Sequence, residues 1–211
     1  MRLKFLSYVD SSRWNSFFYQ IKEVALFNPR SVLIIGALED VAGTVLKANM
    51  NVEIEYFDIQ SMQGVNYIGD IRNFSEIVQD RQWDVILCCQ VLEHIPFEDF
   101  ESVVKEMSLH SRKGVVISLP CAQKTKFHIK VIFENKKMVD YTRMSELYDK
   151  NHRWNKEIDG AGCHDWEIRI GKWSFEKIRN ILNRYYIVRR EYYVPENRYH
   201  YFFVLSKKHN S

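Results

Sequence analysis

SVLIIGALED, residues 31–40, opens the part of the chain that decides the fold, because it joins an apolar run to a glycine and then to two acidic residues. Four more apolar runs follow it: Val52–Asp58, Tyr67–Asp70, Asp84–Cys89 and Gly114–Leu119. The segments between them have apolar residues at helical spacing. Strands that alternate with helices predict a parallel sheet that is covered by helices on both faces.

The ends of these runs carry the residues that suggest a function. The first run ends at Gly36, and the second and third end at Asp58 and Asp70. In an open parallel sheet, ligands bind beyond the carboxyl ends of the strands, where such residues converge. Aspartate is common in exposed turns, so either aspartate alone would be interpreted as a turn residue. Two carboxylates at successive strand ends favour a site that binds a nucleoside.

The rest of the chain extends this pattern and then ends it differently. Apolar residues at helical spacing predict helices over Ser12–Phe27, Asp40–Asn49, Phe74–Asp80, Phe97–His110 and Ser174–Tyr185. Two strand-like runs, Tyr186–Val194 and Tyr199–Leu205, flank a polar turn at residues 195–198, which predicts an antiparallel hairpin. We therefore predict one α/β domain over residues 1–211, whose seven-stranded, mostly parallel sheet ends in this hairpin.

Length and composition fit one soluble domain. The chain has 211 residues, of which 46% are hydrophobic and 27% charged, and no apolar run approaches the roughly 20 residues that span a bilayer. Residues 1–6 begin with charges but lack the apolar core of a signal peptide. The four cysteines form no Cys-x-x-Cys pair, and two of them, Cys88 and Cys89, lie on a predicted buried strand. We expect a cytoplasmic protein.

Positive charge is concentrated in a segment at about residues 121–156, which we interpret as a cap inserted into the domain. It holds nine Lys or Arg and four Asp or Glu, a net +5, whereas the whole chain carries +3. Apolar residues alternate with polar ones from Phe127 to Phe133, and the remainder is polar. A single basic element suggests an anionic substrate, a membrane face or nucleic acid, although an ordinary solvated loop is an equal alternative.

The run DVILCCQVLEHIPFEDF at residues 84–100, with Ile117–Pro120 after it, resembles the middle of the class I S-adenosylmethionine-dependent methyltransferases. The resemblance covers roughly residues 30–206 and is to the small single-domain enzymes grouped with the type 11 and type 12 families. HDWEI at residues 164–168 and ENRYHYFF at residues 196–203 are similar to tail motifs of a bacterial and archaeal subset. The resemblance implies a Rossmann-like methyltransferase sandwich and S-adenosylmethionine as the cofactor.

The resemblance also implies which residues contact that cofactor. The methionine part of the cofactor would lie against the turn at Gly36 and Ala37. Asp58, followed by Ile59, would accept hydrogen bonds from the ribose hydroxyls. The adenine and the rest of the cofactor would contact Asp70, Ile71, Gln90 and Val91.

The turn after the first strand departs from the family pattern, which is acidic-apolar-Gly-x-Gly-x-Gly. Ile34 stands in place of the carboxylate, Leu38 in place of the second glycine and Asp40 in place of the third. Losing a charge-assisted hydrogen bond of this kind removes about 1.5–3 kcal/mol of binding. Glu39 and Asp40 are carboxylates that could substitute from the other side of the turn. The alternative function is a catalytically degenerate methyltransferase fold that serves as a binding or scaffold subunit.

Histidines are the candidates for acid–base chemistry, since an oxygen acceptor needs a nearby base. We select His94, which follows the fourth strand, and His164, which follows the cap; His200 on the hairpin is a weaker candidate, and each could instead be structural. Glu93 is expected to orient its loop. No metal site is predicted, because the nearest acidic and histidine cluster has no recognised spacing: His152, Asp159, His164, Asp165 and Glu167.

The expected acceptor is a small molecule or a glycan, and the lysines of the cap make an anionic acceptor plausible. Aromatic residues make up 14% of the chain and crowd its last third, which favours core packing or a contact between copies in a homo-oligomer. Nucleic acid is not an expected partner, because the cap has few aromatics among its lysines. A nicotinamide oxidoreductase ranks third, since its fold would lack the terminal hairpin.

Overall fold

The computed structural model describes residues 11–36, 40–122, 127–132, 138–143 and 164–208. The helices are α2 (Ser11–Ala25), α3 (Val41–Asn49), α4 (Phe74–Val78), α5 (Phe97–His110) and α6 (Phe175–Tyr185), with short 3-10 helices η1 (Ile71–Asn73) and η2 (Leu92–His94). The strands are β1 (Ser31–Ile35), β2 (Glu53–Asp58), β3 (Tyr67–Ile68), β4 (Trp83–Cys89), β5 (Ser111–Pro120), β6 (Phe127–Ile132), β7 (Met138–Arg143), β8 (Tyr186–Val194) and β9 (Asn197–Lys207).

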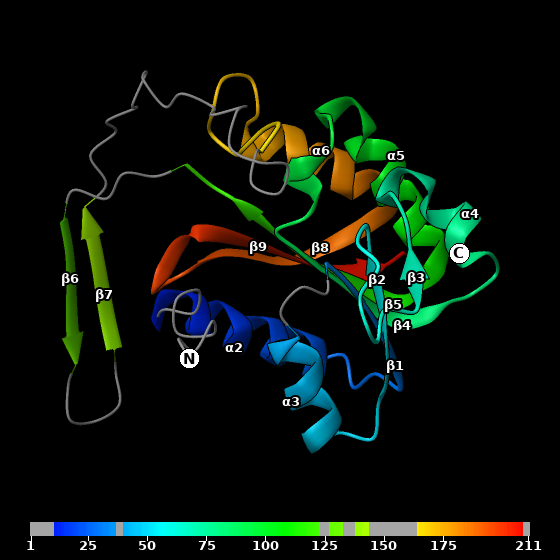
Figure 1. Ribbon diagram of the computed structural model, residues 1–211. Coiled ribbons are helices and arrows are strands. Elements are labelled where there is room, and N and C mark those ends of the chain that lie inside the picture. Colours follow the sequence, from blue (N-terminus) through cyan, green and yellow to red (C-terminus); the bar gives the residue numbers. More distant parts are fainter. Residues whose placement is uncertain (1–10, 37–39, 123–126, 133–137, 144–163, 209–211) are drawn as a thin grey trace, which may run out of the picture.

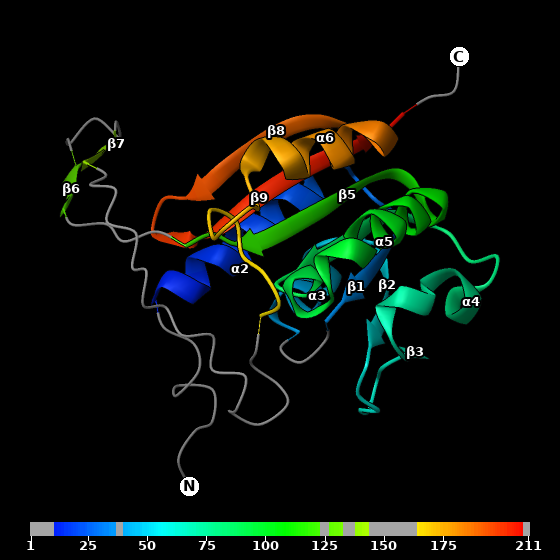
Figure 2. The same ribbon diagram turned by 90° about the horizontal axis from the view of Figure 1, so that it is seen from above.

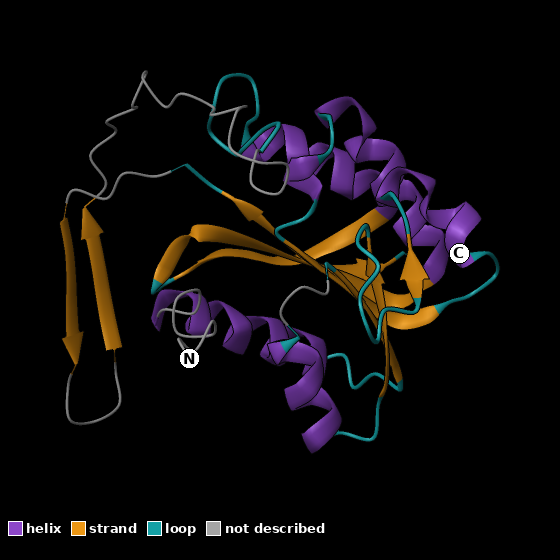
Figure 3. Ribbon diagram, viewed as in Figure 1, coloured by secondary structure: helices purple, strands orange, loops and turns teal. Residues whose placement is uncertain are grey.

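Seven of these strands form one sheet in the order β3-β2-β1-β4-β5-β9-β8. The pairs from β3 to β5 are parallel, whereas β9 runs antiparallel to both β5 and β8. Helices α2 and α3 cover one face of the sheet, and α5 and α6 cover the other (Figures 1 and 3). The predicted fold class is therefore confirmed, including the terminal hairpin.

The chain order places a topological switch point at β1. From β1 the sheet grows outward in one direction through β2 and β3, and in the other direction through β4 and β5. At such a point the connections diverge to opposite faces and leave a crevice beyond the carboxyl ends of the strands, where ligands bind. Gly36, Asp58 and Gln90 all directly follow or end strands at this edge.

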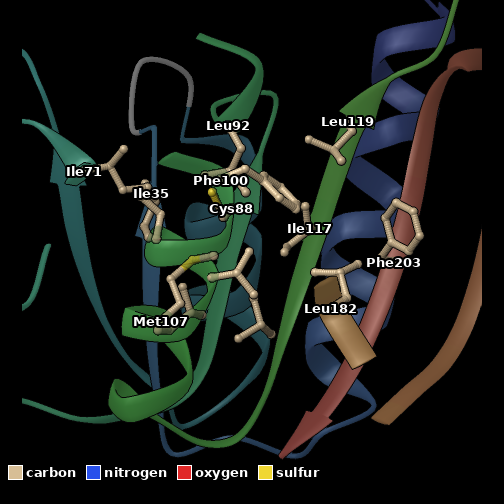
Figure 4. Packing of buried hydrophobic residues seen from close by; sticks show 14 of the residues in the cluster. Ile35, Ile71, Cys88, Leu92, Phe100, Met107, Ile117, Leu119, Leu182 and Phe203 are labelled. Atoms are coloured by element: carbon tan, nitrogen blue, oxygen red, sulfur yellow. The ribbon is translucent and has the colours of Figure 1, made fainter. Parts of the chain in front are cut away.

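Burial of the strands on both faces explains why their sequences are apolar throughout rather than alternating. All five residues of β1 are buried, with Leu33 and Ile35 in the cluster beneath α5 and α6. Val32 and Ile34 point to the other face, into the cluster that α2 and α3 complete. Figure 4 shows the larger cluster, in which side chains from α5 and α6, including Phe100, Met107 and Leu182, meet those of β1, β4 and β5.

Element boundaries differ from the predicted ones by a few residues, for identifiable reasons. Helix α4 ends at Val78, two residues early, because Gln79 adopts a positive φ of 53°. Strand β5 begins at Ser111 instead of Gly114, since Ser111 already pairs with Trp83. Strand β9 begins at Asn197, so the turn of the hairpin contains only Pro195 and Glu196. None of these shifts changes the order of the elements.

The segment predicted as an inserted cap contains a separate two-stranded sheet, in which β6 and β7 pair antiparallel from Phe127↔Arg143 to Ile132↔Met138. This hairpin lies away from the main sheet in both views (Figures 1 and 2). Strand β6 coincides with the alternating run in the sequence. A parallel bridge between Cys121 and Ile168 joins the chain just after β5 to the chain after the basic segment. Much of the basic segment lies outside the described residues.

In the part of the chain that the structure describes, we find no helix with the length and apolar character needed to cross a membrane.

Candidate cofactor and catalytic site

Gly36 forms the tight turn that the sequence predicted at the end of β1. Its φ is +84°, a conformation that favours glycine, and its N–H donates to the carbonyl of Phe57 at 2.9 Å. A Cβ atom built on Gly36 would lie only 2.6 Å from Cγ2 of Val91, so the ends of β1 and β4 approach closely here. The predicted contact Ala37, and Leu38, which stands in place of the second glycine of the family pattern, lie outside the described residues.

Asp58 occupies the carboxyl end of β2, one strand away from Gly36. Its side chain is 9% exposed, and its Oδ1 accepts a hydrogen bond from the backbone N–H of Gln60 at 2.8 Å. The backbone carbonyl of Asp58 accepts from Gly69 N–H at 3.0 Å, which ties this strand end to the end of β3. Ile59 is 68% exposed, an unusual position for isoleucine. Both predicted residues therefore lie at the expected edge.

Asp70 also lies at this edge, but its carboxylate is already engaged. It caps η1 by accepting from Arg72 N–H at 2.9 Å, and it pairs with the Arg72 guanidinium, with Nη2 at 2.6 Å from Oδ2. These hydrogen bonds lower the pKa of Asp70, which remains ionised. An adenine amino group would share the carboxylate with Arg72. Ile71 is 5% exposed and packs within the core cluster, so only the edge of its side chain is available to a ligand.

Gln90, the first residue after β4, is held in a sparsely populated conformation with φ of 55°. Its N–H donates to the carbonyl of Ser118 at 2.9 Å, and its side-chain Nε2 donates to Ser118 Oγ at 3.1 Å. The amide thus turns toward β5, and the half-buried Val91 is what faces Gly36. Strained backbone at a strand end is typical of functional sites.

The structure also places two of the residues that depart from the family pattern. Ile34 is 6% exposed and packs in the cluster beneath α2 and α3, so no acceptor stands at its position. Asp40 was a candidate substitute, yet its Oδ2 accepts a hydrogen bond from the hydroxyl of Tyr56 on β2. Burial, together with this bond, raises the pKa of the Tyr56 hydroxyl. Asp40 is therefore held toward the sheet, and Glu39 lies outside the described residues.

His94 and His164, which are 70 positions apart in sequence, lie together beside this edge. Their ring centroids are 4.9 Å apart in an edge-to-face arrangement. Glu93 joins them: one ligand atom from each of the three side chains lies within 4.8 Å of the others. His94 N–H donates to the carbonyl of Val91 at 3.0 Å, so the cluster is one short turn from the residue that contacts Gly36.

Glu93 is the most unusual member of this cluster. Its side chain is fully buried, and neither carboxyl oxygen has a hydrogen-bond partner in the part of the chain that the structure describes. Burial raises its pKa to about 8, with a further contribution from the nearby carboxylate of Glu167. A buried carboxyl group normally has partners, because an unpaired one loses its solvation without compensation. The sequence had suggested only that Glu93 orients the loop.

Glu167 and Tyr199 both contact Nδ1 of the His164 ring. Glu167 is 3% exposed, and its Oε1 lies 2.8 Å from Nδ1 of His164. The hydroxyl of Tyr199 donates to the same oxygen at 2.6 Å. A histidine whose Nδ1 donates to a carboxylate keeps Nε2 as its free lone pair, and that atom lies 4.0 Å from Oε1 of Glu93. His164 is thus oriented by two residues. The sequence had grouped Glu167 with His164 only as a possible metal ligand, and it had not linked Tyr199 to either residue.

The other candidates from the sequence lie elsewhere. His200 is 9% exposed and pairs with Pro120 across β5 and β9, so it points to the face of the sheet opposite to its neighbour Tyr199. Asp165 is exposed, although its N–H donates to the carbonyl of Glu93 at 2.8 Å. His152 and Asp159 fall outside the described residues.

No protein-family model matches this chain, and no curated protein sequence matches it either. Solved structures do match it. The N-methyltransferase NodS from Bradyrhizobium japonicum in complex with S-adenosylhomocysteine gives a TM-score of 0.59 at 11% identity, over 95% of this chain and 89% of that one. A 1,6-didemethyltoxoflavin-N1-methyltransferase from Burkholderia thailandensis with S-adenosylhomocysteine gives 0.56 at 10% identity, over 93% and 81%.

An S-adenosylmethionine-dependent methyltransferase from Clostridium acetobutylicum gives a TM-score of 0.56 at 12% identity, over 96% of this chain and 94% of that chain. Identities this low compare architecture and leave function open. The alignments cover 93–96% of this chain and 81–94% of the other chains, so the similarity extends over the whole architecture. The chain therefore has the fold of the class I methyltransferases.

Proposed function

We propose that this chain is an S-adenosylmethionine-dependent methyltransferase. The observation that carries the proposal is the convergence of Gly36, Asp58, Asp70 and Val91 at the switch-point edge of a sheet with this fold. Two similar structures hold S-adenosylhomocysteine, the product form of that cofactor. An adenosine needs a hydroxyl-accepting carboxylate and a close backbone approach, and this edge provides both.

Each residue at the edge would have a definite task. The Gly36 turn lets the backbone approach the ligand without a side chain, and Asp58 accepts from the ribose hydroxyls. Asp70, Ile71 and Val91 would contact the adenine, and the exposed Ile59 would cover the ribose. S-adenosylmethionine supplies an electrophilic methyl group, so the protein needs chiefly to align an acceptor with it.

His164 is the better placed of the two candidate bases. Its Nδ1 is held by Glu167, which leaves Nε2 to accept a proton from an acceptor hydroxyl at the same edge. His94 is exposed and could exchange that proton with solvent. We propose a small or glycan-like acceptor; an anionic one would suit the basic segment at residues 121–156. We also propose a reducing compartment, the cytoplasm, because the described cysteines form no disulfide with one another.

The alternative is a degenerate methyltransferase fold that acts as a binding or scaffold subunit. Two observations favour it: Ile34 offers no acceptor where the family pattern has a carboxylate, and Asp40 is held by Tyr56 instead of facing the turn. The two functions differ in whether the edge binds the cofactor at all.

Calorimetric titration of S-adenosylhomocysteine into the purified chain separates them. We expect micromolar binding, weakened at least about tenfold in Asp58→Ala, because a hydrogen bond to a charged acceptor contributes about 1.5–3 kcal/mol. Asp80→Ala is the matched control, since Asp80 is an exposed aspartate in the turn after α4. No heat at millimolar ligand would favour the scaffold, and equal binding by Asp58→Ala would contradict the assigned edge.

A further inference from the structure

We propose that Glu93, His94 and His164 bind a divalent transition-metal ion, which in turn binds the oxygen of the methyl acceptor. The first half of this inference stands on the cluster alone, whereas the acceptor contact rests on the proposed methyltransferase function. It departs from the expectation, drawn from sequence, that the chain has no metal site.

The donor set selects the class of metal. Two imidazole nitrogens and one carboxylate suit zinc, iron, manganese or cobalt, whereas magnesium and calcium prefer ligands that are all oxygen. Three protein ligands are also the number found in catalytic sites, which keep positions open for water or substrate. The three side chains come from two separate segments, since His164 follows the cap and the others belong to η2. A hydrogen bond of 2.8 Å from the backbone N–H of Asp165 to the carbonyl of Glu93 joins these segments.

The unsatisfied carboxyl group of Glu93 is an independent indication of a cation. Both oxygens are buried and without a hydrogen-bond partner among the described residues. A group of this kind needs an explanation, and one explanation is an ion that completes its coordination. Its position supports that reading, because ligand atoms of two histidines lie within 4.8 Å of its carboxyl group.

The environment of His164 matches that of a metal ligand. Metal-bound histidines almost always donate their second ring N–H to a carboxylate or carbonyl, which fixes the ring and the tautomer. Glu167 accepts from Nδ1 of His164 at 2.8 Å, and Tyr199 donates to the same Glu167 oxygen at 2.6 Å. The remaining nitrogen, Nε2, is the one that lies toward Glu93, at 4.0 Å from its Oε1.

The distances show how far the cluster is from its bound geometry. Two ligands with bonds of about 2.1 Å can be at most about 4.2 Å apart, across the metal. The described ligand atoms span up to 4.8 Å, so the side chains must draw together by roughly 1 Å. His94 is exposed and can supply most of this movement by changing rotamer, whereas His164 and Glu93 are held in place.

An ion at this position would lie beside the cofactor edge. His94 is hydrogen-bonded to Val91, which in turn contacts Gly36. A bound divalent ion lowers the pKa of an oxygen ligand and orients it, so that a hydroxyl acceptor can lose its proton to solvent. In this arrangement Nε2 of His164 is a metal ligand, and the ion replaces it as the group that activates the hydroxyl. If the chain methylates, the inference therefore assigns the acceptor to the hydroxyl-bearing compounds that chelate metals, such as vicinal diols.

The test is calorimetric titration of Zn²⁺, Mn²⁺ and Co²⁺ into the untagged chain after EDTA treatment, with the visible spectrum of the Co²⁺ form as a second readout. We expect one ion per chain. His94→Ala and Glu93→Gln should each weaken binding at least about 100-fold and alter the Co²⁺ bands. Glu167→Gln should weaken it about 10–100-fold, as expected for a residue that positions a ligand.

Asp165→Asn is the matched control, since it removes an exposed carboxylate beside His164 and should change affinity less than twofold. Thermal melts of each metal-free variant establish that it folds; His94→Ala is the safest, because His94 is exposed. Failure of all three ions to bind at millimolar concentration overturns the inference, as does unchanged binding by His94→Ala. Titration of S-adenosylhomocysteine into the same samples reports separately on the methyltransferase proposal.

Discussion

Replacing Glu93 with glutamine should remove a pH dependence of stability that the metal-free wild-type chain shows between about pH 4.5 and pH 8. Burial raises the pKa of Glu93 to about 8 in the folded chain, compared with 4.5 for the unfolded residue. Glu167 adds to this effect. His94 and His164 also face the carboxyl group, and Cys88, Cys89 and Tyr199 are further titratable groups that interact with it. Glutamine has nearly the same shape and stays neutral at every pH.

The sign follows from proton linkage. Between the two pKa values the folded chain binds a proton at Glu93 that the unfolded chain has lost, so folding is favoured at low pH. This contribution is fully present below the unfolded pKa of 4.5 and is lost as the pH rises through 8. At 1.36 kcal/mol per pH unit, the full difference is about 5 kcal/mol, of which about 3.5 kcal/mol is lost between pH 5 and pH 8.

Urea unfolding in EDTA at pH 5, 6, 7 and 8, followed by tryptophan fluorescence, measures this effect. The free energy of unfolding of the wild type minus that of Glu93→Gln should fall by about 3.5 kcal/mol over this range. Titrating groups that do not interact with Glu93 are common to both proteins and cancel in the difference. A flat difference would show that Glu93 has an ordinary pKa and is not held in a dry pocket. A difference that rises with pH would mean that a positive partner stabilises the ionised form.

Two further substitutions test the scaffold around the site by the same urea assay. Trp166→Ala should cost about 3–5 kcal/mol, because this fully buried ring packs edge-to-face on Phe97 and donates to the carbonyl of Ile95 at 3.1 Å; a cost below 1 kcal/mol would contradict the packing. Ser174→Ala should cost about 1 kcal/mol through loss of the N-cap bond from Lys177 N–H at 3.1 Å, and an unchanged midpoint would show that α6 needs no cap.

The architecture was predictable from sequence because its signals are local. Apolar runs that end in Gly36, Asp58 or Asp70 mark strands and the ends at which a ligand would bind. Because helices cover both faces of the sheet, its strands are apolar throughout and can be recognised without an alternating pattern. The hairpin was equally visible, since its two runs flank a short polar turn. Position along the chain thus determines which residues reach the switch-point edge.

The chemistry of the site was predicted less well, because it depends on contacts between distant segments. His94 and His164 were both named as candidates, yet nothing in their spacing shows that they meet, or that Glu93 lies buried between them. Tyr199 reaches Glu167 only because β9 lies beside β5 in the finished sheet. The engagement of Asp70 by Arg72 is different: the two are neighbours in sequence, and that pairing could have been anticipated.

The parallel bridge between Cys121 and Ile168 affects how the length of this chain can change without disturbing the main sheet. The chain leaves the sheet and returns to it at the same rung, where Ile168 N–H donates to Pro120 at 3.0 Å and Ala122 N–H donates to Ile168 at 3.1 Å. The intervening segment therefore begins and ends at positions that are hydrogen-bonded to each other at the end of β5. Doubling its length would cost only about 0.6 kcal/mol in loop closure. Evolution, or protein engineering, could therefore insert a new segment there while the remaining strands keep their register.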